Sequence, residues 1–159
     1  MQDFVHLHVH TQYSLLDGQA SVARLVDKAM QNGMKGIAVT DHGNMFGIKE
    51  FTNYVNKKNS GPKGEVKDLK KRIAGIEAGT IECEDKEAEI AACKAKIVEA
   101  ENKLFKPIIG CEMYVARRTM DLKEGKPDQS GYHLIVLAKN ETGYHNLIKL
   151  VSHAWTRGY

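Results

Sequence analysis

The sequence has 159 residues, of which 42% are hydrophobic and 27% charged, and its formal net charge at pH 7 is +3. This composition is that of a globular domain with a sizeable core and excludes a disordered chain, while the small net charge gives no argument of its own for nucleic-acid binding. We expect no signal peptide and no membrane contact, because no apolar run approaches membrane-spanning length. The three cysteines lack zinc-finger spacing, so we expect a reduced, cytoplasmic protein.

The first predicted element lies in the segment FVHLHVHT, residues 4–11, where His6, His8 and His10 alternate with apolar residues. Strict alternation predicts a β-strand over residues 4–9 with the three imidazoles on one face. The imidazoles either find separate hydrogen-bond partners or bind one metal ion together. We favour the metal, because imidazole is the commonest metal ligand near neutral pH.

Strands and helices are then predicted in alternation along the chain. Strands are expected at 36–40, 107–116 and 133–138, and helices at 21–32, about 45–55 and 141–154. This order predicts an α/β fold with a largely parallel sheet or barrel.

Residues 60–106 interrupt the alternation, because they are dense in charge and have no strand pattern. Apolar residues recur at steps of three and four in both halves of this segment, with Gly79 between the halves. The pattern predicts an antiparallel helical hairpin in which two narrow apolar seams bury each other. Lys and Glu alternate along it, so we interpret the charges as a solvated surface rather than a nucleic-acid-binding stripe.

Candidate metal ligands lie near the ends of the predicted strands, where functional groups gather in parallel α/β folds. They are His8 and His10 in the first strand, Asp17 in the loop after it, His42 after the second, Glu112 in the third and His133 in the fourth. Each has a structural alternative as a turn residue, an ion-pair partner or a surface histidine, but their joint placement favours one metal site. Imidazole mixed with carboxylate suits zinc, manganese or iron.

Four sequence blocks, taken in order, resemble a known family. HLHVHT, TDHGN and GCE resemble the opening motifs of the PHP (polymerase and histidinol phosphatase) superfamily. YSLLDG, TDHGNMFG, KPIIGCEMYV and HLIVLAKNETGYHNLIKLVSHA resemble one branch of it, the N-terminal PHP domains of bacterial DNA polymerase III α subunits. The resemblance implies that residues 1–159 form part of a distorted (β/α)₇ barrel with metal ions at its mouth, and that residues 60–106 are an inserted hairpin arm.

Carried over by motif, the resemblance implies that His8, His10, Asp17, His42, Glu112 and His133 bind divalent metal ions, zinc or manganese foremost and iron as a further option. It implies that Asp41 orients a neighbouring ligand and that His6 lies in the barrel core or beside the ligands. Arg117 and Arg118 are weaker candidates for holding phosphate, since a solvated loop is the favoured interpretation there. The family draws further ligands from later strands, so we expect a piece of a longer barrel, with partial metal binding and little activity of its own.

The implied function is that of a DNA-directed DNA polymerase subunit whose PHP domain is a metal-dependent phosphoesterase, a 3′–5′ proofreading exonuclease acting on DNA beside other replisome subunits. The alternative is a non-catalytic scaffold that stabilises the polymerase or docks a separate exonuclease subunit. A stand-alone phosphatase for a small phosphoester is disfavoured, because GYHNLIKLVSHA resembles the polymerase branch specifically.

Overall fold

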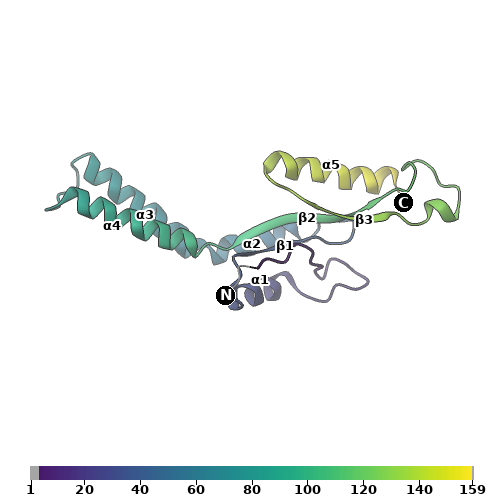
Figure 1. The fold of residues 1–159 in the computed structure, drawn as a ribbon, viewed down its shortest axis with the longest axis horizontal. Coiled ribbons are helices and arrows are strands. Elements are labelled where there is room, and N and C mark those ends of the chain that lie inside the picture. Colours follow the sequence, from purple (N-terminus) through teal and green to yellow (C-terminus); the bar gives the residue numbers. More distant parts are fainter. Residues whose placement is uncertain (1–3, 159) are drawn as a thin grey trace. The chain divides into compact units, whose positions relative to one another are not determined.

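The structure is a computed structural model that describes residues 4–158. Its elements, in chain order, are α1 (Val22–Gln31), β1 (Gly36–Val39), α2 (Ile48–Lys58), α3 (Ser60–Glu77), α4 (Lys86–Asn102), β2 (Lys106–Val115), the 3₁₀ turn η1 (Lys126–Asp128), β3 (Tyr132–Leu137) and α5 (Glu141–Arg157) (Figure 1). The chain divides into two compact units, residues 1–54 with 106–159, and residues 55–105. None of the described helices combines the length and apolarity needed to cross a membrane.

The first unit is built on a three-stranded sheet of order β1-β2-β3. β1 is buried along its whole length and pairs with β2 in parallel, whereas β2 and β3 are antiparallel. The predicted mixed α/β fold is confirmed, but the expectation of a largely parallel sheet is wrong for β3. Residues 116–131 contain no crossover helix, and a direct return of this kind leaves the following strand antiparallel to the one before it.

The helices of the first unit bury short apolar stripes. α1 begins after Ser21, whose side chain accepts the N–H of Arg24 as an N-cap, as the sequence predicted. α5 buries Leu147 and Val151 against Cys111 of β2, and Figure 1 shows it running along β2 and β3. Because successive residues of a strand face opposite sides of a sheet, the residue after Cys111 points away from α5.

Residues 4–10 do not form the predicted β-strand. The carbonyl of His6 accepts the N–H of Ala38 and the carbonyl of Val9 accepts the N–H of Thr40, both at 2.9 Å, so the segment does run beside β1. Between these two hydrogen bonds the N-terminal segment advances by three residues, from His6 to Val9, while its neighbour advances by two, from Ala38 to Thr40. The segment therefore contains one extra residue and bends at Leu7 and His8, as a strand does at a β-bulge. The alternation is therefore broken, and Leu7 is 48% exposed instead of facing the core.

The second unit contains α3 and α4, which lie side by side in Figure 1 and confirm the two helices predicted between residues 60 and 106. Gly79, with a φ of 73°, lies in the turn that follows α3. Ile76 of α3 and Cys93 and Ala100 of α4 are buried. Exposed ion pairs between the helices, such as Arg72 with Glu89 at 2.8 Å, leave the charges on the surface.

Candidate metal centre

The candidate site lies where β1 ends beside β2. Beyond Val39 the parallel pairing continues as a single bridge between His42 and Glu112. The N–H of Glu112 donates to the carbonyl of Asp41 at 3.1 Å, and the N–H of Gly43 donates to the carbonyl of Glu112 at 2.9 Å. Glu112 follows Cys111, so its side chain points away from α5, and only 2% of that side chain is exposed.

Five side chains converge around the Glu112 carboxylate. The six residues together are named the histidine–carboxylate cluster: His8, His10, Asp17, His42, Glu112 and His133. Glu112 Oε2 lies 2.6 Å from His8 Nε2 and 3.1 Å from His10 Nε2. Glu112 Oε1 lies 2.5 Å from His133 Nδ1 and 3.3 Å from His42 Nδ1. Asp17 joins through His42, because its Oδ2 is 3.0 Å from His42 Nε2. The structure thus brings together all six side chains that the sequence singled out as ligands.

His133 reaches the cluster because β3 is antiparallel. It stands at the start of β3, opposite Tyr114 near the carboxyl end of β2, and their ring centroids are 4.7 Å apart. In a parallel strand, the start would lie at the opposite edge of the sheet from the end of β2. The antiparallel pairing that contradicts the predicted topology is therefore what places His133 beside Glu112.

The histidine–carboxylate cluster has a buried base and an open rim. Glu112 is buried, whereas the side chains of His8, Asp17 and His133 are 55–60% exposed. Burial alone raises the pKa of Glu112, but the hydrogen bond with His8 and the charges of the surrounding imidazoles outweigh it and lower that pKa below its ordinary value. The arrangement holds an ionised carboxylate under a group of imidazoles that solvent can reach.

Asp41 lies behind the cluster rather than in it. Its buried carboxylate accepts the N–H of Thr11 at 2.6 Å, the hydroxyl of Thr11 at 2.8 Å and the hydroxyl of Ser14 at 2.7 Å. The Ser14 oxygen in turn lies 3.1 Å from Nδ1 of His10. Sequence reasoning missed Thr11 and Ser14, although both lie within the quoted motifs HLHVHT and YSLLDG, because nothing in their spacing indicates what their hydroxyls contact.

Three other sequence candidates lie apart from the cluster. His6, expected in the barrel core or beside the ligands, is exposed and packs edge-on against Phe4, and within residues 4–158 it makes no side-chain contact with the cluster. Arg118 pairs with Asp128 and Glu124, and Arg117 binds the carbonyl of Ser130, so both arginines brace their own loop.

The donor atoms of the cluster fit a divalent cation. His8 Nε2, His10 Nε2 and Glu112 Oε2 lie 2.6–3.1 Å from one another, and ligand atoms around a tetrahedral zinc ion are separated by about 3.4 Å. Among the described residues, Glu112 Oε1 is buried and accepts no hydrogen bond of acceptable geometry, although two ring nitrogens face it. A buried oxygen in this situation is costly unless a cation balances it.

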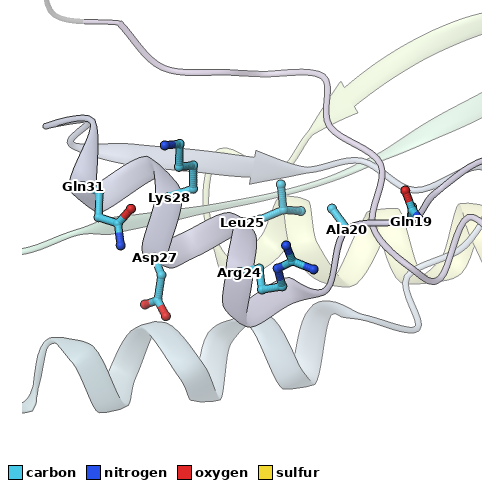
Figure 2. A pocket seen from close by; sticks show the side chains of 7 residues that line it. All are labelled: Gln19, Ala20, Arg24, Leu25, Asp27, Lys28 and Gln31. Atoms are coloured by element: carbon cyan, nitrogen blue, oxygen red, sulfur yellow. The ribbon is translucent and has the colours of Figure 1, made fainter.

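A depression lies beside α1. Figure 2 shows the residues that line it, which run from Gln19 to Gln31 and include Arg24, Asp27 and Lys28. Asp27, the carboxylate among them, accepts the hydroxyl of Tyr54 at 2.8 Å. The lining shares no residue with the histidine–carboxylate cluster, so the depression gives no competing site for metal chemistry.

A mixed α/β fold with imidazoles and carboxylates gathered at strand ends is the arrangement that the PHP resemblance implies, and a family model supports that resemblance. The PHP domain model matches residues 6–159, and the chain belongs to the PHP domain family. The DNA polymerase III subunit alpha of Treponema pallidum (strain Nichols) is 40% identical over 156 residues, covering 98% of this chain and 10% of that protein. The same subunit of Borreliella burgdorferi is 39% identical over 159 residues, with the same coverage.

The subunit of Aquifex aeolicus is 32% identical over 164 residues, covering 99% of this chain and 10% of that protein. The resemblance to the polymerase branch is therefore confirmed as homology along nearly the whole chain. The chain spans about a tenth of the length of these curated relatives.

Proposed function

We propose that this chain works as the PHP domain of a replicative DNA polymerase III α subunit and that its histidine–carboxylate cluster binds divalent cations, zinc or manganese foremost and iron as a further option. The convergence of four imidazoles on the buried Glu112 carboxylate, with Asp17 joined through His42, supports the metal site. The choice of metals rests on the donor set, because imidazole and carboxylate without thiolate suit these ions. Cys111, the cysteine next to Glu112, does not offer a thiolate ligand at neutral pH, because burial raises the pKa of its thiol to about 11.

The proposed reaction is hydrolysis of a phosphodiester at the 3′ end of a DNA strand. Bound divalent cations supply Lewis acidity to such a reaction, polarising the phosphoryl oxygen and making water more acidic. The residues of this chain contribute placement: Glu112 anchors the base from β2, while His8 and His10 reach it from the N-terminal segment. The exposed rim formed by His8, Asp17 and His133 leaves room for a phosphate to approach.

Partners and architecture follow from the relatives. We propose that the chain meets DNA and other replisome subunits as part of a longer cytoplasmic polymerase subunit, and that its sheet belongs to a distorted (β/α)₇ barrel in which residues 60–106 are an inserted arm. Homology along 98% of the chain to subunits about ten times longer supports this proposal.

The metal proposal is tested by titrating the purified chain with Zn²⁺ and Mn²⁺ against a competing chelator. Glu112→Gln keeps the shape of the side chain but removes its charge, and we expect it to weaken binding at least tenfold, with a similar loss for His10→Ala. His6→Ala is a matched control, because His6 lies two residues from His8 on the same segment yet apart from the cluster. Equal affinity of Glu112→Gln and the parent chain would refute the site.

The catalytic proposal is tested separately with a 3′-labelled oligonucleotide and the polymerase subunit that contains this domain. Metal-dependent release of the 3′ nucleotide, lost in His10→Ala and kept in His6→Ala, is the expected result. Tight metal binding without hydrolysis would instead favour the scaffold, in which the domain stabilises the polymerase or docks a separate exonuclease subunit.

A further inference from the structure

The hydroxyl of Ser14 connects three parts of the site. It donates to Asp41 Oδ1 at 2.7 Å, lies 3.1 Å from His10 Nδ1 and accepts the backbone N–H of His42 at 3.2 Å. Ser14 is 1% exposed and Asp41 is equally buried, so water does not compete for these contacts. A buried hydroxyl with three partners has little freedom to rotate.

The hydrogen bonds of Ser14 determine which nitrogen of the His10 ring carries the hydrogen. An ionised carboxylate only accepts hydrogen bonds, so the single proton of Ser14 is committed to Asp41. The Ser14 oxygen then meets His10 as an acceptor, which requires the hydrogen of the neutral ring to be on Nδ1. His10 Nε2 is left with a lone pair, and that atom lies 3.1 Å from Glu112 Oε2 and 2.9 Å from His8 Nε2.

Backbone contacts keep Ser14 in place. Its N–H donates to the carbonyl of Thr11 at 2.9 Å, and its own carbonyl accepts the N–H of Gly18 at 2.7 Å. Asp41 holds Thr11 as well, through two hydrogen bonds. The carboxylate therefore fixes both ends of the turn from Thr11 to Ser14, and with it the direction of the hydroxyl.

We propose that Ser14 is a positioning residue for the metal site: anchored on Asp41, its hydroxyl holds His10 in the Nδ1–H tautomer and so presents Nε2 as a ligand atom. This proposal deepens the proposed metal site and rests on it. Without the hydroxyl, the Nε2–H tautomer becomes competitive, because its hydrogen can be donated to Glu112 Oε2. A protonated Nε2 has no lone pair for a cation.

The test compares the metal-free parent chain with Ser14→Ala, which removes only the hydroxyl. Long-range ¹H–¹⁵N NMR at pH 8.5, where histidine rings are ordinarily neutral, assigns the tautomer of His10, and a Zn²⁺ titration measures affinity. Ser21→Ala is the matched control, since it removes a hydroxyl that caps α1 instead.

We expect His10 to carry its hydrogen on Nδ1 in the parent chain and in Ser21→Ala. In Ser14→Ala we expect that preference to be lost and Zn²⁺ affinity to fall about 10–100-fold, the usual cost of losing an outer hydrogen-bond partner. An Nε2–H tautomer in the parent chain, or Nδ1–H retained in Ser14→Ala, would overturn the proposal, as would an altered tautomer with unchanged affinity. Absence of Zn²⁺ binding by the parent chain would refute the proposed metal site. In that case the His10 tautomer, measured in the parent chain and in Ser14→Ala, would still show whether Ser14 determines which ring nitrogen carries the hydrogen.

Discussion

At the scale of single residues, Gly18 closes the loop that presents Asp17 to His42. Its N–H completes the turn by donating to the carbonyl of Ser14. A Cβ placed on Gly18 would lie 1.9 Å from the carbonyl oxygen of Thr11 and 2.9 Å from the Cβ of Ser14. Both neighbours are held by Asp41, so neither can yield without disturbing the hydrogen bonds behind the cluster.

Gly18→Ala should therefore destabilise the fold by about 1–3 kcal/mol, the usual cost of overpacking, and weaken Zn²⁺ binding because Asp17 and Ser14 are displaced. Urea unfolding and Zn²⁺ titration measure the two effects. Gly64→Ala is the control, since a Cβ there meets nothing within 4 Å and alanine favours a helix. Unchanged stability and affinity in Gly18→Ala would show that the loop adapts more easily than its contacts suggest.

Asp128 anchors the loop between β2 and β3. It accepts hydrogen bonds from the Arg118 guanidinium and from the N–H of Glu124 at 2.9 Å, and these contacts lower its pKa below the ordinary value of 3.8. A carboxyl group whose pKa is lower in the folded state stabilises the fold above its unfolded pKa. That contribution is lost as the pH falls through the lowered folded pKa.

Asp128→Asn should consequently lower the thermal midpoint at pH 7, and the difference from the parent chain should shrink once the pH falls below 3.8 towards the lowered pKa. Thermal unfolding followed by circular dichroism between pH 2 and pH 7 measures this. Asp121→Asn is the comparison, because Asp121 pairs with Arg157 on an exposed surface and such pairs contribute little. A pH-independent difference for Asp128→Asn would contradict the linkage.

At the scale of elements, one extra residue in the N-terminal segment breaks the alternation of histidine and apolar side chains. The alternation of FVHLHVHT predicts a strand with His6, His8 and His10 on one face. The bend at Leu7 and His8 separates His6 from the other two, which then meet at Glu112. The pattern therefore predicted that His8 and His10 would lie together, which they do, but it assigned them the wrong local structure.

Asn59 links the start of α3 to the end of α4 through its side chain. Its buried side-chain amide donates to the carbonyl of Phe105 at 2.8 Å and accepts the N–H of Phe105 at 2.9 Å. The pair of bonds ties the residue before α3 to a residue that follows α4. Replacing the amide would leave two buried backbone groups without partners.

Asn59→Ala should cost about 2–6 kcal/mol of hairpin stability, since each of the two unsatisfied buried groups costs about 1–3 kcal/mol. Hydrogen exchange of the α3 and α4 amides measures the loss. Asn56→Ala is the matched control, because the side chain of Asn56 is exposed and accepts a hydrogen bond from Lys63 at the surface. Equal exchange rates in the two variants would argue that the apolar seam alone closes the hairpin.

At the scale of the whole molecule, the chain consists of two compact units, and all six residues of the histidine–carboxylate cluster belong to the first. The contacts that orient the cluster, from Asp41, Thr11 and Ser14, also come from that unit. The second unit contributes no residue to the cluster or to these supports.

Replacing residues 60–104 with a short turn should leave Zn²⁺ affinity unchanged within error, because every donor and every support for a donor is retained. A Zn²⁺ titration of the shortened and parent chains makes the comparison, and circular dichroism checks that the shortened chain is folded. A large loss of affinity in a folded, shortened chain would show that the arm does take part in forming the site.

Local patterns in the chain were sufficient to predict the helices, β1 and β2, because side-chain periodicity and caps act between near neighbours. The motif residues were sufficient to single out the six side chains that lie together in the structure, whereas their role as ligands stays a prediction. The direction of β3, the bend at His8 and the contacts of Ser14 were not predictable in this way. Each depends on residues distant in sequence: His133 meets Glu112 only because β3 returns antiparallel to β2, and Ser14 meets Asp41 only because the first loop packs against the end of β1. Periodicity can place an imidazole near the end of a strand, whereas the atom it faces is set by the packing of separate segments against each other.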